Sequence, residues 1–242
     1  MKKVAYTIGA LAMTAGAVSA GGVERAVTSP TLLFEPGNYF EFSFSHAGPD
    51  VSGTQAVTVP VAPGIAFPAG ASSGNMAEDF TLFSFGLKKQ LSDKLDLAIV
   101  LDQPIGANVN YRAGTGYIYG GSTATINSNA LTAMLRYRVN DNISVYGGLK
   151  AERAKGNVAL FNGYTMSTSN ETDFGYMVGA AYEKPEIALR VALTYNSAIT
   201  HRFAVTENGA PSLPFETEVP QPVALDFQTG VAKDTLVFGS VR

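Results

Sequence analysis

Hydrophobic and polar residues alternate over long stretches of this chain. Between Ile187 and Val205 the odd positions are mostly apolar, as at Leu193. The even positions carry polar or small side chains, as at Arg190. Because successive residues of a β-strand point to opposite faces, this pattern predicts one strand with an apolar face and a polar face. A strand much longer than the roughly 5–6 residues of a globular strand is typical of a membrane barrel wall.

Other stretches alternate in the same way, and together they predict nine strands. Besides residues 187–205, these are residues 38–46, 79–91, 95–102, 124–139, 143–161, 172–183, 220–232 and 235–242. Long connections follow the first, third, fifth and seventh strands, including a loop over residues 206–219. Tight turns follow the others. This alternation is typical of an all-β, antiparallel, up-and-down transmembrane barrel with short periplasmic turns and long outer loops.

The third strand is interrupted. It meets Asp102, Gln103, Pro104, Ile105 and Gly106. Proline lacks the amide hydrogen that a strand ladder needs, and glycine permits a bend. We therefore predict a kink or an early end to the strand here.

The N-terminal residues predict export, and the number of strands predicts a partial barrel. Residues 1–20 have two lysines, an apolar middle and a small-residue end, which predicts a signal peptide cleaved after Ala20. Residues 21–37 are a lead-in, and residues 38–242 form the barrel portion. Because bacterial single-chain barrels have an even number of strands, nine strands suggest the N-terminal portion of a longer barrel.

Composition narrows the function classes. The chain has 242 residues, no cysteine and a net charge of −3. It shows no basic stripe, so nothing supports nucleic-acid binding. It also lacks a continuous apolar run of the ~18–20 residues that a membrane helix needs. Hydrophobic residues make up 46% of the chain, which fits either a soluble β protein or a barrel that spreads them over many strands.

Several segments resemble the outer-membrane long-chain fatty acid transport family, the FadL/TodX type. They include PTLLFEPGNYFEFSFSHAGPDVSGT, LDLAIVLDQPIGANVNY, LTAMLRYRVNDNISVYGGLKAERAKG and FGYMVGAAYEKPEIALRVALTYNSAITHRF. The resemblance implies a fourteen-stranded barrel with an N-terminal hatch, and passive transport of hydrophobic ligands. It also implies that the third-strand kink opens laterally through the wall. Residues 21–37 would be a shortened hatch, with Ser29-Pro30-Thr31 where the family has Asn-Pro-Ala.

A fatty acid requires an apolar path and a cationic or hydrogen-bonding stop for its carboxylate. Strand parity places six cations in the lumen, where they could instead pair with wall carboxylates. They are Lys88, Arg136, Arg138, Lys150, Arg190 and Arg202. The GLKAERAKG segment resembles a family segment that supplies a carboxylate-contacting arginine, which implies Arg153, although parity points Arg153 toward lipid.

The residues expected to contact ligand combine these cations with aromatic side chains of the outer loops. They are Arg153, Lys150, Arg190, Phe161, Tyr164, Phe203 and Phe215. The aromatic residues would form a capture surface, or would simply pack within their loops.

Three functions fit these patterns. The first is a passive transporter, monomeric in the outer membrane of a Gram-negative cell, whose partners are a fatty acid or hydrocarbon and the surrounding lipid. The second is a general porin or structural barrel. The third is a barrel lipid hydrolase, suggested by the G-x-S-x-G match around Ser72 and by His46 and His201. We expect the first, which is not an enzyme and needs no cofactor and no metal.

Overall fold

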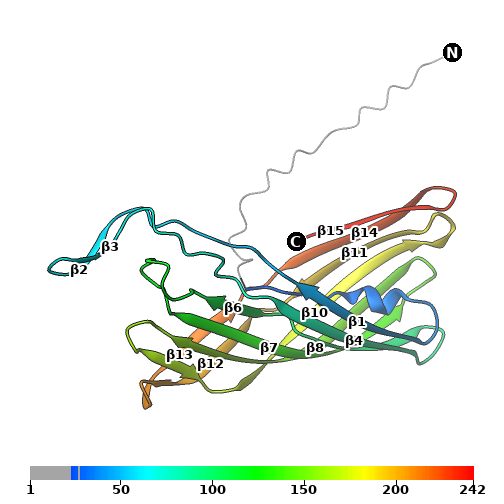
Figure 1. Ribbon diagram of the computed structural model, residues 1–242. Coiled ribbons are helices and arrows are strands. Elements are labelled where there is room, and N and C mark those ends of the chain that lie inside the picture. Colours follow the sequence, from blue (N-terminus) through cyan, green and yellow to red (C-terminus); the bar gives the residue numbers. More distant parts are fainter. Residues whose placement is uncertain (1–22, 27) are drawn as a thin grey trace, which may run out of the picture.

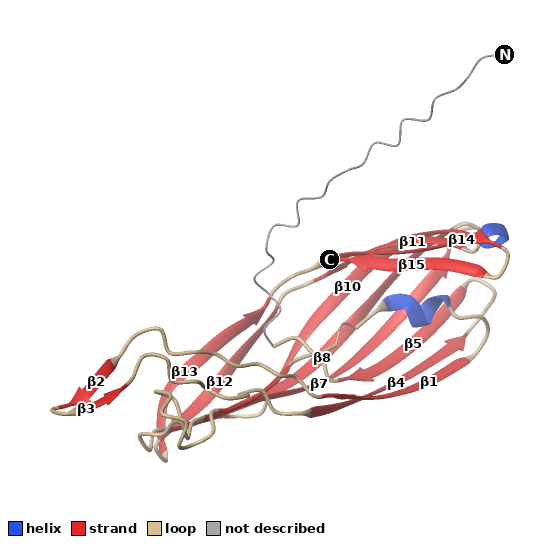
Figure 2. Cartoon of the chain, turned by 45° about the horizontal axis from the view of Figure 1, so that its top comes forward, coloured by secondary structure: helices blue, strands red, loops and turns tan. Residues whose placement is uncertain are grey.

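The structure, a computed structural model, describes residues 23–26 and 28–242 (Figure 1). The predicted signal peptide, residues 1–20, lies outside the described residues, as do residues 21, 22 and 27. One large antiparallel sheet, curled into an open half-barrel, makes up most of the fold (Figure 2). The predicted all-β, up-and-down architecture is therefore confirmed for a partial barrel.

The sheet follows the order of the chain, which is what an up-and-down topology requires. Its central path is β1-β4-β5-β7-β8-β10-β11-β14-β15. These strands are β1 (Tyr39–Ala47), β4 (Phe80–Gln90), β5 (Leu95–Asp102), β7 (Thr123–Arg138), β8 (Ile143–Ala159), β10 (Glu171–Lys184), β11 (Leu189–Asn196), β14 (Val223–Ala232) and β15 (Thr235–Val241). Within the described residues, β1 and β15 are the two edges of this path.

The connections divide the half-barrel into two ends. Tight turns join β4 to β5, β7 to β8 and β14 to β15, and the short helix η2 (Pro185–Ile187) joins β10 to β11. We call this the turn end. The long connections gather at the opposite end, the loop end, as predicted (Figure 1).

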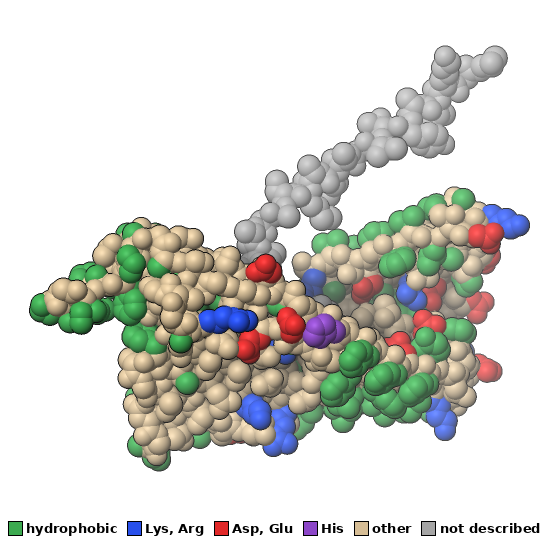
Figure 3. Space-filling view, viewed as in Figure 1, with side chains coloured by type: hydrophobic (Ala, Val, Ile, Leu, Met, Phe, Trp, Pro, Cys, Tyr) green, Lys and Arg blue, Asp and Glu red, His purple; other side chains and the backbone are tan. Residues whose placement is uncertain are grey.

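The two faces of the wall differ as the alternation predicts. Large apolar side chains cover the outer face, where Phe42, Leu149 and Phe174 are 62%, 71% and 75% exposed. A patch of such side chains is visible over the lower right of Figure 3. Charged residues instead lie buried on the inner face, including Lys88 and Asp96 at 0% exposure. This arrangement is the inverse of a soluble protein and is typical of a barrel in lipid.

The predicted single strand over residues 187–205 is wrong. The chain forms β11, leaves the strand at Ser197 and Ala198, and resumes as β12 (Ile199–Glu207). The apolar side chains change face across this interruption. Leu193 is 53% exposed on the outer face, whereas Phe203 is 5% exposed and packs inside. Arg202, predicted to face the lumen, is exposed instead.

The predicted loop over residues 206–219 is also wrong. Most of it is β13 (Ala210–Val219), which forms a hairpin with β12. A positive φ of 48° at Asn208 and of 80° at Gly209 makes the tight turn. Four more short strands lie in other connections: β6 (Gly106–Asn110) and β9 (Thr165–Thr168) join the main sheet, and β2 (Val59–Ala62) pairs only with β3 (Ile65–Phe67).

One helical turn lies against the inner face. The 3-10 helix η1 (Pro30–Phe34) contacts β4, β5 and β7 near the turn end. Among the described residues, no helix is long and apolar enough to cross a membrane.

Candidate functional site

The candidate site is the inner face of the half-barrel together with a break in its wall. Strand β5 ends at Asp102 and β6 begins at Gly106, and both pair with β7. The partners of these two residues on β7 are Ala130 and Asn127. Three residues of the break therefore face two on β7, so the ladder cannot continue in register.

Side-chain bonds replace the lost ladder on one side of the break. The Ser128 hydroxyl accepts from the Ile105 N–H and donates to the Ile105 carbonyl, both at 2.8 Å. Pro104 has no N–H to satisfy. The predicted interruption at Pro104 is therefore confirmed, and the Ser128 hydroxyl replaces the ladder bonds that Ile105 would otherwise make.

The N-terminal segment, residues 23–26 and 28, lies along the other side of the break. Glu24 pairs with Ile105 as an isolated antiparallel bridge. The Pro104 carbonyl accepts from the N–H groups of Arg25 and Ala26 at 2.8 and 3.3 Å. The Thr28 hydroxyl donates to the Asp102 carboxylate at 2.6 Å. A segment that precedes the break by 74 residues or more in the sequence thus closes this gap.

Gly106 lets the N-terminal segment approach the wall closely. A Cβ added at Gly106 would lie 2.5 Å from the Arg25 guanidinium. That guanidinium also sits 4.2 Å above the Phe80 ring, a cation–π contact. Any larger residue at 106 would therefore push the Arg25 side chain away.

The next residues form a plug, defined here as residues 29–37. Ser29 caps η1 by accepting from the Thr31 N–H. Leu32 and Leu33 are 3% and 0% exposed, and they pack in a cluster with inward side chains such as Met134. The plug is thus the apolar filling of an otherwise polar interior near the turn end.

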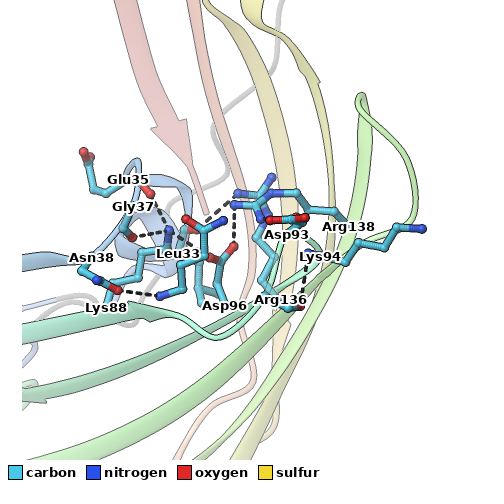
Figure 4. Close-up of polar contacts among 12 residues, drawn as sticks. Leu33, Glu35, Gly37, Asn38, Lys88, Asp93, Lys94, Asp96, Arg136 and Arg138 are labelled. Carbon is cyan, nitrogen blue, oxygen red and sulfur yellow. Dashed lines mark hydrogen bonds and ion pairs between the residues drawn. The ribbon is translucent and has the colours of Figure 1, made fainter.

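Inward cations hold the plug by its backbone carbonyls (Figure 4). Lys88 Nζ donates to the carbonyls of Glu35 at 2.6 Å and Gly37 at 3.0 Å. Its charge is balanced by Asp96 at 3.0 Å. Arg136 donates to the Leu33 carbonyl at 3.2 Å. Because the plug residues here offer carbonyl oxygens, cations on the wall are the complementary partners.

Arg190, predicted to contact ligand, lies at the plug. Its guanidinium is 4.7 Å from the Phe34 ring, and that of Arg136 is 4.4 Å from the same ring. Arg136 is paired with Glu183. The Phe34 ring also meets Tyr146 edge-on at 5.8 Å. Arg190 therefore belongs to the turn-end half of the lumen.

A second charged network occupies the loop-end half. Glu152 is fully buried and lies 3.0 Å from Lys150 Nζ and 3.5 Å from His201 Nε2. His201 Nδ1 lies 2.9 Å from Asp173. The His201 ring also stacks on Phe203 at 5.7 Å. Two of the predicted ligand residues, Lys150 and Phe203, thus come together around a histidine.

The sequence did not identify Glu152, Asp173 and His201 as parts of one network. Glu152 and Asp173 are cross-strand partners on β8 and β10, so correct strand pairing would have revealed half of the network. His201 lies after the Ser197–Ala198 interruption, where parity predicted the wrong face.

Arg153 lies apart from both networks, exposed on the outer face as parity indicates. Its cross-strand neighbours are Asn129 and Thr172. The next row toward the turn end is apolar and consists of Leu131, Ala151 and Phe174. Arg153 therefore marks the level at which the outer face changes from apolar to polar.

The predicted aromatic residues lie at the loop end but do not form one surface. Phe161 is 46% exposed and meets Phe67 edge-on at 6.0 Å. Phe215 is 48% exposed and stacks on Phe203 at 6.3 Å. Tyr164 donates to the Glu207 carboxylate at 2.6 Å, and this hydrogen bond raises the pKa of the Tyr164 phenol.

The G-x-S-x-G match lies in a loop. Ser72 forms an isolated bridge with Thr54, and its hydroxyl accepts from the Gly74 N–H at 3.1 Å. A nucleophile of this motif needs a strand–turn–helix setting. His46 contacts Thr81 and Asp79 instead.

Comparison with known proteins places the fold. No family model matches the chain, and no curated protein matches it. The chain is similar to the crystal structure of a Pseudomonas aeruginosa FadL homologue, with a TM-score of 0.55 and 16% sequence identity. The match covers 81% of this chain and 56% of that chain. The likeness therefore shows a FadL-like fold, and this chain spans a little over half of that structure.

Proposed function

We propose that this chain forms the wall and plug of an outer-membrane passive transporter for long-chain fatty acids or similar hydrophobic compounds. An apolar outer face suits surrounding lipid, and a plugged polar interior restricts free passage of water. The observation that carries the proposal is the wall break at Gln103, Pro104 and Ile105, which the N-terminal segment closes. An exit directly into lipid is favourable for an apolar ligand, because its apolar surface is then not exposed to water.

The path begins at the loop end and leads to the break. Phe161 and Phe215 present exposed rings there, which suits capture of an apolar chain. Lys150 lies further in, with a side chain that is 20% exposed. An ammonium group has three donors, and Glu152 engages one of them at 3.0 Å. Lys150 therefore keeps donors for a ligand carboxylate.

The break then acts as a lateral gate. Few bonds hold the N-terminal segment to it. They are the two N–H bonds to Pro104, the bond from the Gly106 N–H to the Val23 carbonyl and the Thr28 bond to Asp102. Glu24 also forms an ion pair with Arg242. Each such bond contributes about 0.5–1.5 kcal/mol, or about 1.5–3 kcal/mol to a charged group. Release of the segment is thus a modest cost that ligand binding can offset.

A reversible crosslink tests this gate. The chain has no cysteine, so the double variant Glu24→Cys with Ile105→Cys introduces one defined pair at the bridge. Directly paired residues lie about 4.5–5.5 Å apart at Cα, within the range for a disulfide. We expect cells expressing it to take up labelled oleate only after reduction.

Two controls make the result specific. Glu24→Cys alone controls for the loss of the Glu24 side chain. Ala181→Cys with Ala192→Cys joins two wall strands at a directly paired position, and its oxidation should leave uptake unchanged. Equal uptake by oxidised and reduced gate variants, or equal uptake with and without the gene, would refute the proposal.

The polar inner face also suits a porin for hydrophilic solutes. Conductance in planar bilayers separates the two functions. A steady ion current through the unmodified protein would favour the porin, provided that expressing the gene has no effect on oleate uptake by cells.

A further inference from the structure

The hairpin of β2 and β3 projects from the loop end, away from the rest of the molecule (Figure 1). Val57, Val61 and Ile65 are 63%, 52% and 63% exposed. Figure 3 shows apolar side chains gathered at its tip. Exposed apolar clusters of this kind mark interaction sites.

Residues 51–77, which contain the hairpin, include no Asp, Glu, Lys, Arg or His. This stretch lies in the long connection between β1 and β4. The connection over residues 103–122 carries Arg112, and that over residues 197–222 carries Arg202 and Glu207. The much shorter connection over residues 160–170 is also uncharged. A long uncharged stretch avoids the large penalty of moving a charge into an apolar medium.

Both faces of the hairpin are apolar. Val59 pairs with Phe67, and Pro60 pairs with Ala66 on the opposite face. A hairpin that docks on a protein surface needs only one apolar face, because its other face stays in water. A tip that is apolar on both faces suits immersion in an apolar phase.

Buried polar side chains stabilise the stem below the tip, which contains Gln55 and Ser73. Gln55 is 7% exposed, and its side-chain amide donates to the carbonyls of Val57 at 3.1 Å and Phe67 at 2.7 Å. The side-chain carbonyl of Gln55 accepts a hydrogen bond from the Ile118 N–H at 3.1 Å. Ser73, 1% exposed, accepts from the Gly53 N–H at 2.7 Å. The stem therefore holds the tip out from the protein.

We propose that this tip inserts into the surface of an uncharged oil, such as a hydrocarbon or neutral lipid droplet outside the cell. Segments that bind phospholipid headgroups typically use Lys and Arg on one face, with Trp or Tyr at the interface. Residues 51–77 have none of these. The absence of charge and the two apolar faces together match an uncharged oil better than a headgroup layer.

The inference concerns delivery of ligand to the proposed transporter, but the two can be tested separately. The full chain in lipid nanodiscs is mixed with hexadecane droplets and floated by centrifugation. We expect the unmodified protein to float with the droplets. The double variant Val61→Asp with Ile65→Asp should lower the droplet-bound fraction at least tenfold, because it places two charges in the oil.

Matched variants isolate the tip. Val61→Thr with Ile65→Thr makes the tip more polar without adding charge and should give an intermediate fraction. Leu213→Asp adds one such charge at a residue 84% exposed on β13, and should leave flotation within twofold of the unmodified protein. A heat-modifiability gel confirms that each variant is folded.

Three outcomes would overturn the inference: flotation unchanged in the Asp variant, flotation lost equally in Leu213→Asp, or stronger retention by phosphatidylglycerol vesicles than by hexadecane. Oleate uptake from albumin is measured in parallel. The tip variants should keep that uptake, because no oil surface is involved. Flotation without any uptake would refute only the transporter.

Discussion

Two breaks interrupt the wall, and different partners close them. The break between β11 and β12 is closed within the wall. Ser197 donates its N–H to the Tyr176 carbonyl, and its hydroxyl accepts from the Tyr176 N–H, both at 2.9 Å. The backbone N–H and carbonyl of Tyr176 on the neighbouring strand β10 therefore both have a hydrogen-bond partner at this break.

The break between β5 and β6 is closed in part from outside the wall. Ser128 satisfies Ile105, but the Pro104 carbonyl accepts from the N-terminal segment. That segment belongs to no wall strand, so its release leaves the pairing of β5 and β6 with β7 in place and removes, from the backbone of these strands, only the partner of the Gly106 N–H on this side. An interrupted strand thus becomes a candidate gate only when a detachable segment closes it.

The largest expected effect comes from Lys88, the anchor of the plug. Lys88→Met leaves Asp96 buried beside only its other partner, Arg138, at 2.7 Å. Breaking a buried pair costs about 3–5 kcal/mol. We expect this loss in urea unfolding, and faster protease cleavage of the N-terminal segment. Lys89→Met, at an exposed neighbour, is the control; equal stability of the two variants would contradict the assigned anchor.

The next effect concerns the membrane depth of the wall before and after the second break. Leu193 lies before it on the outer face, so Leu193→Arg should cost about 2–4 kcal/mol if the residue lies near the membrane midplane. Ala204 lies after it and is exposed at the loop end. Ala204→Arg should cost only about 0–1 kcal/mol, as near an interface. Insertion efficiency into lipid vesicles measures both, and similar costs would show that the two strands share one level.

Much of this fold follows from the sequence because a wall between lipid and a polar interior imposes period-two alternation. That alternation located the central strands, and Pro104 located the first break. The second break escaped because Ser197 and Ala198 include no proline or glycine. Beyond it, Phe203 is apolar yet faces inward. Alternation alone cannot distinguish an apolar residue in lipid from one in a loop-end core.

The Glu152, Asp173 and His201 network was missed for a related reason. Its members come from three strands, β8, β10 and β12. Sequence parity assigns a face to each strand, but it does not give the register between strands that puts these residues side by side.

A smaller effect tests the latch of the first break. Thr28→Val removes the hydrogen bond to Asp102, which is 5% exposed. A bond to a charged group contributes about 1.5–3 kcal/mol. We expect faster proteolysis of the N-terminal segment and faster oleate uptake. Thr28→Ser retains the hydroxyl and should restore both rates; if it behaves like Thr28→Val, the hydrogen bond is not the latch.

The smallest effect lies at the second break. Ser197→Ala removes the hydroxyl that accepts from Tyr176 N–H, a loss of about 0.5–1.5 kcal/mol. The wall strands on both sides keep their own ladders, so urea unfolding should record this loss while oleate uptake stays unchanged. The comparison fails here if Ser197→Ala raises uptake as much as Thr28→Val does. Both breaks would then open, and closure by a detachable segment would no longer distinguish a gate from a bend.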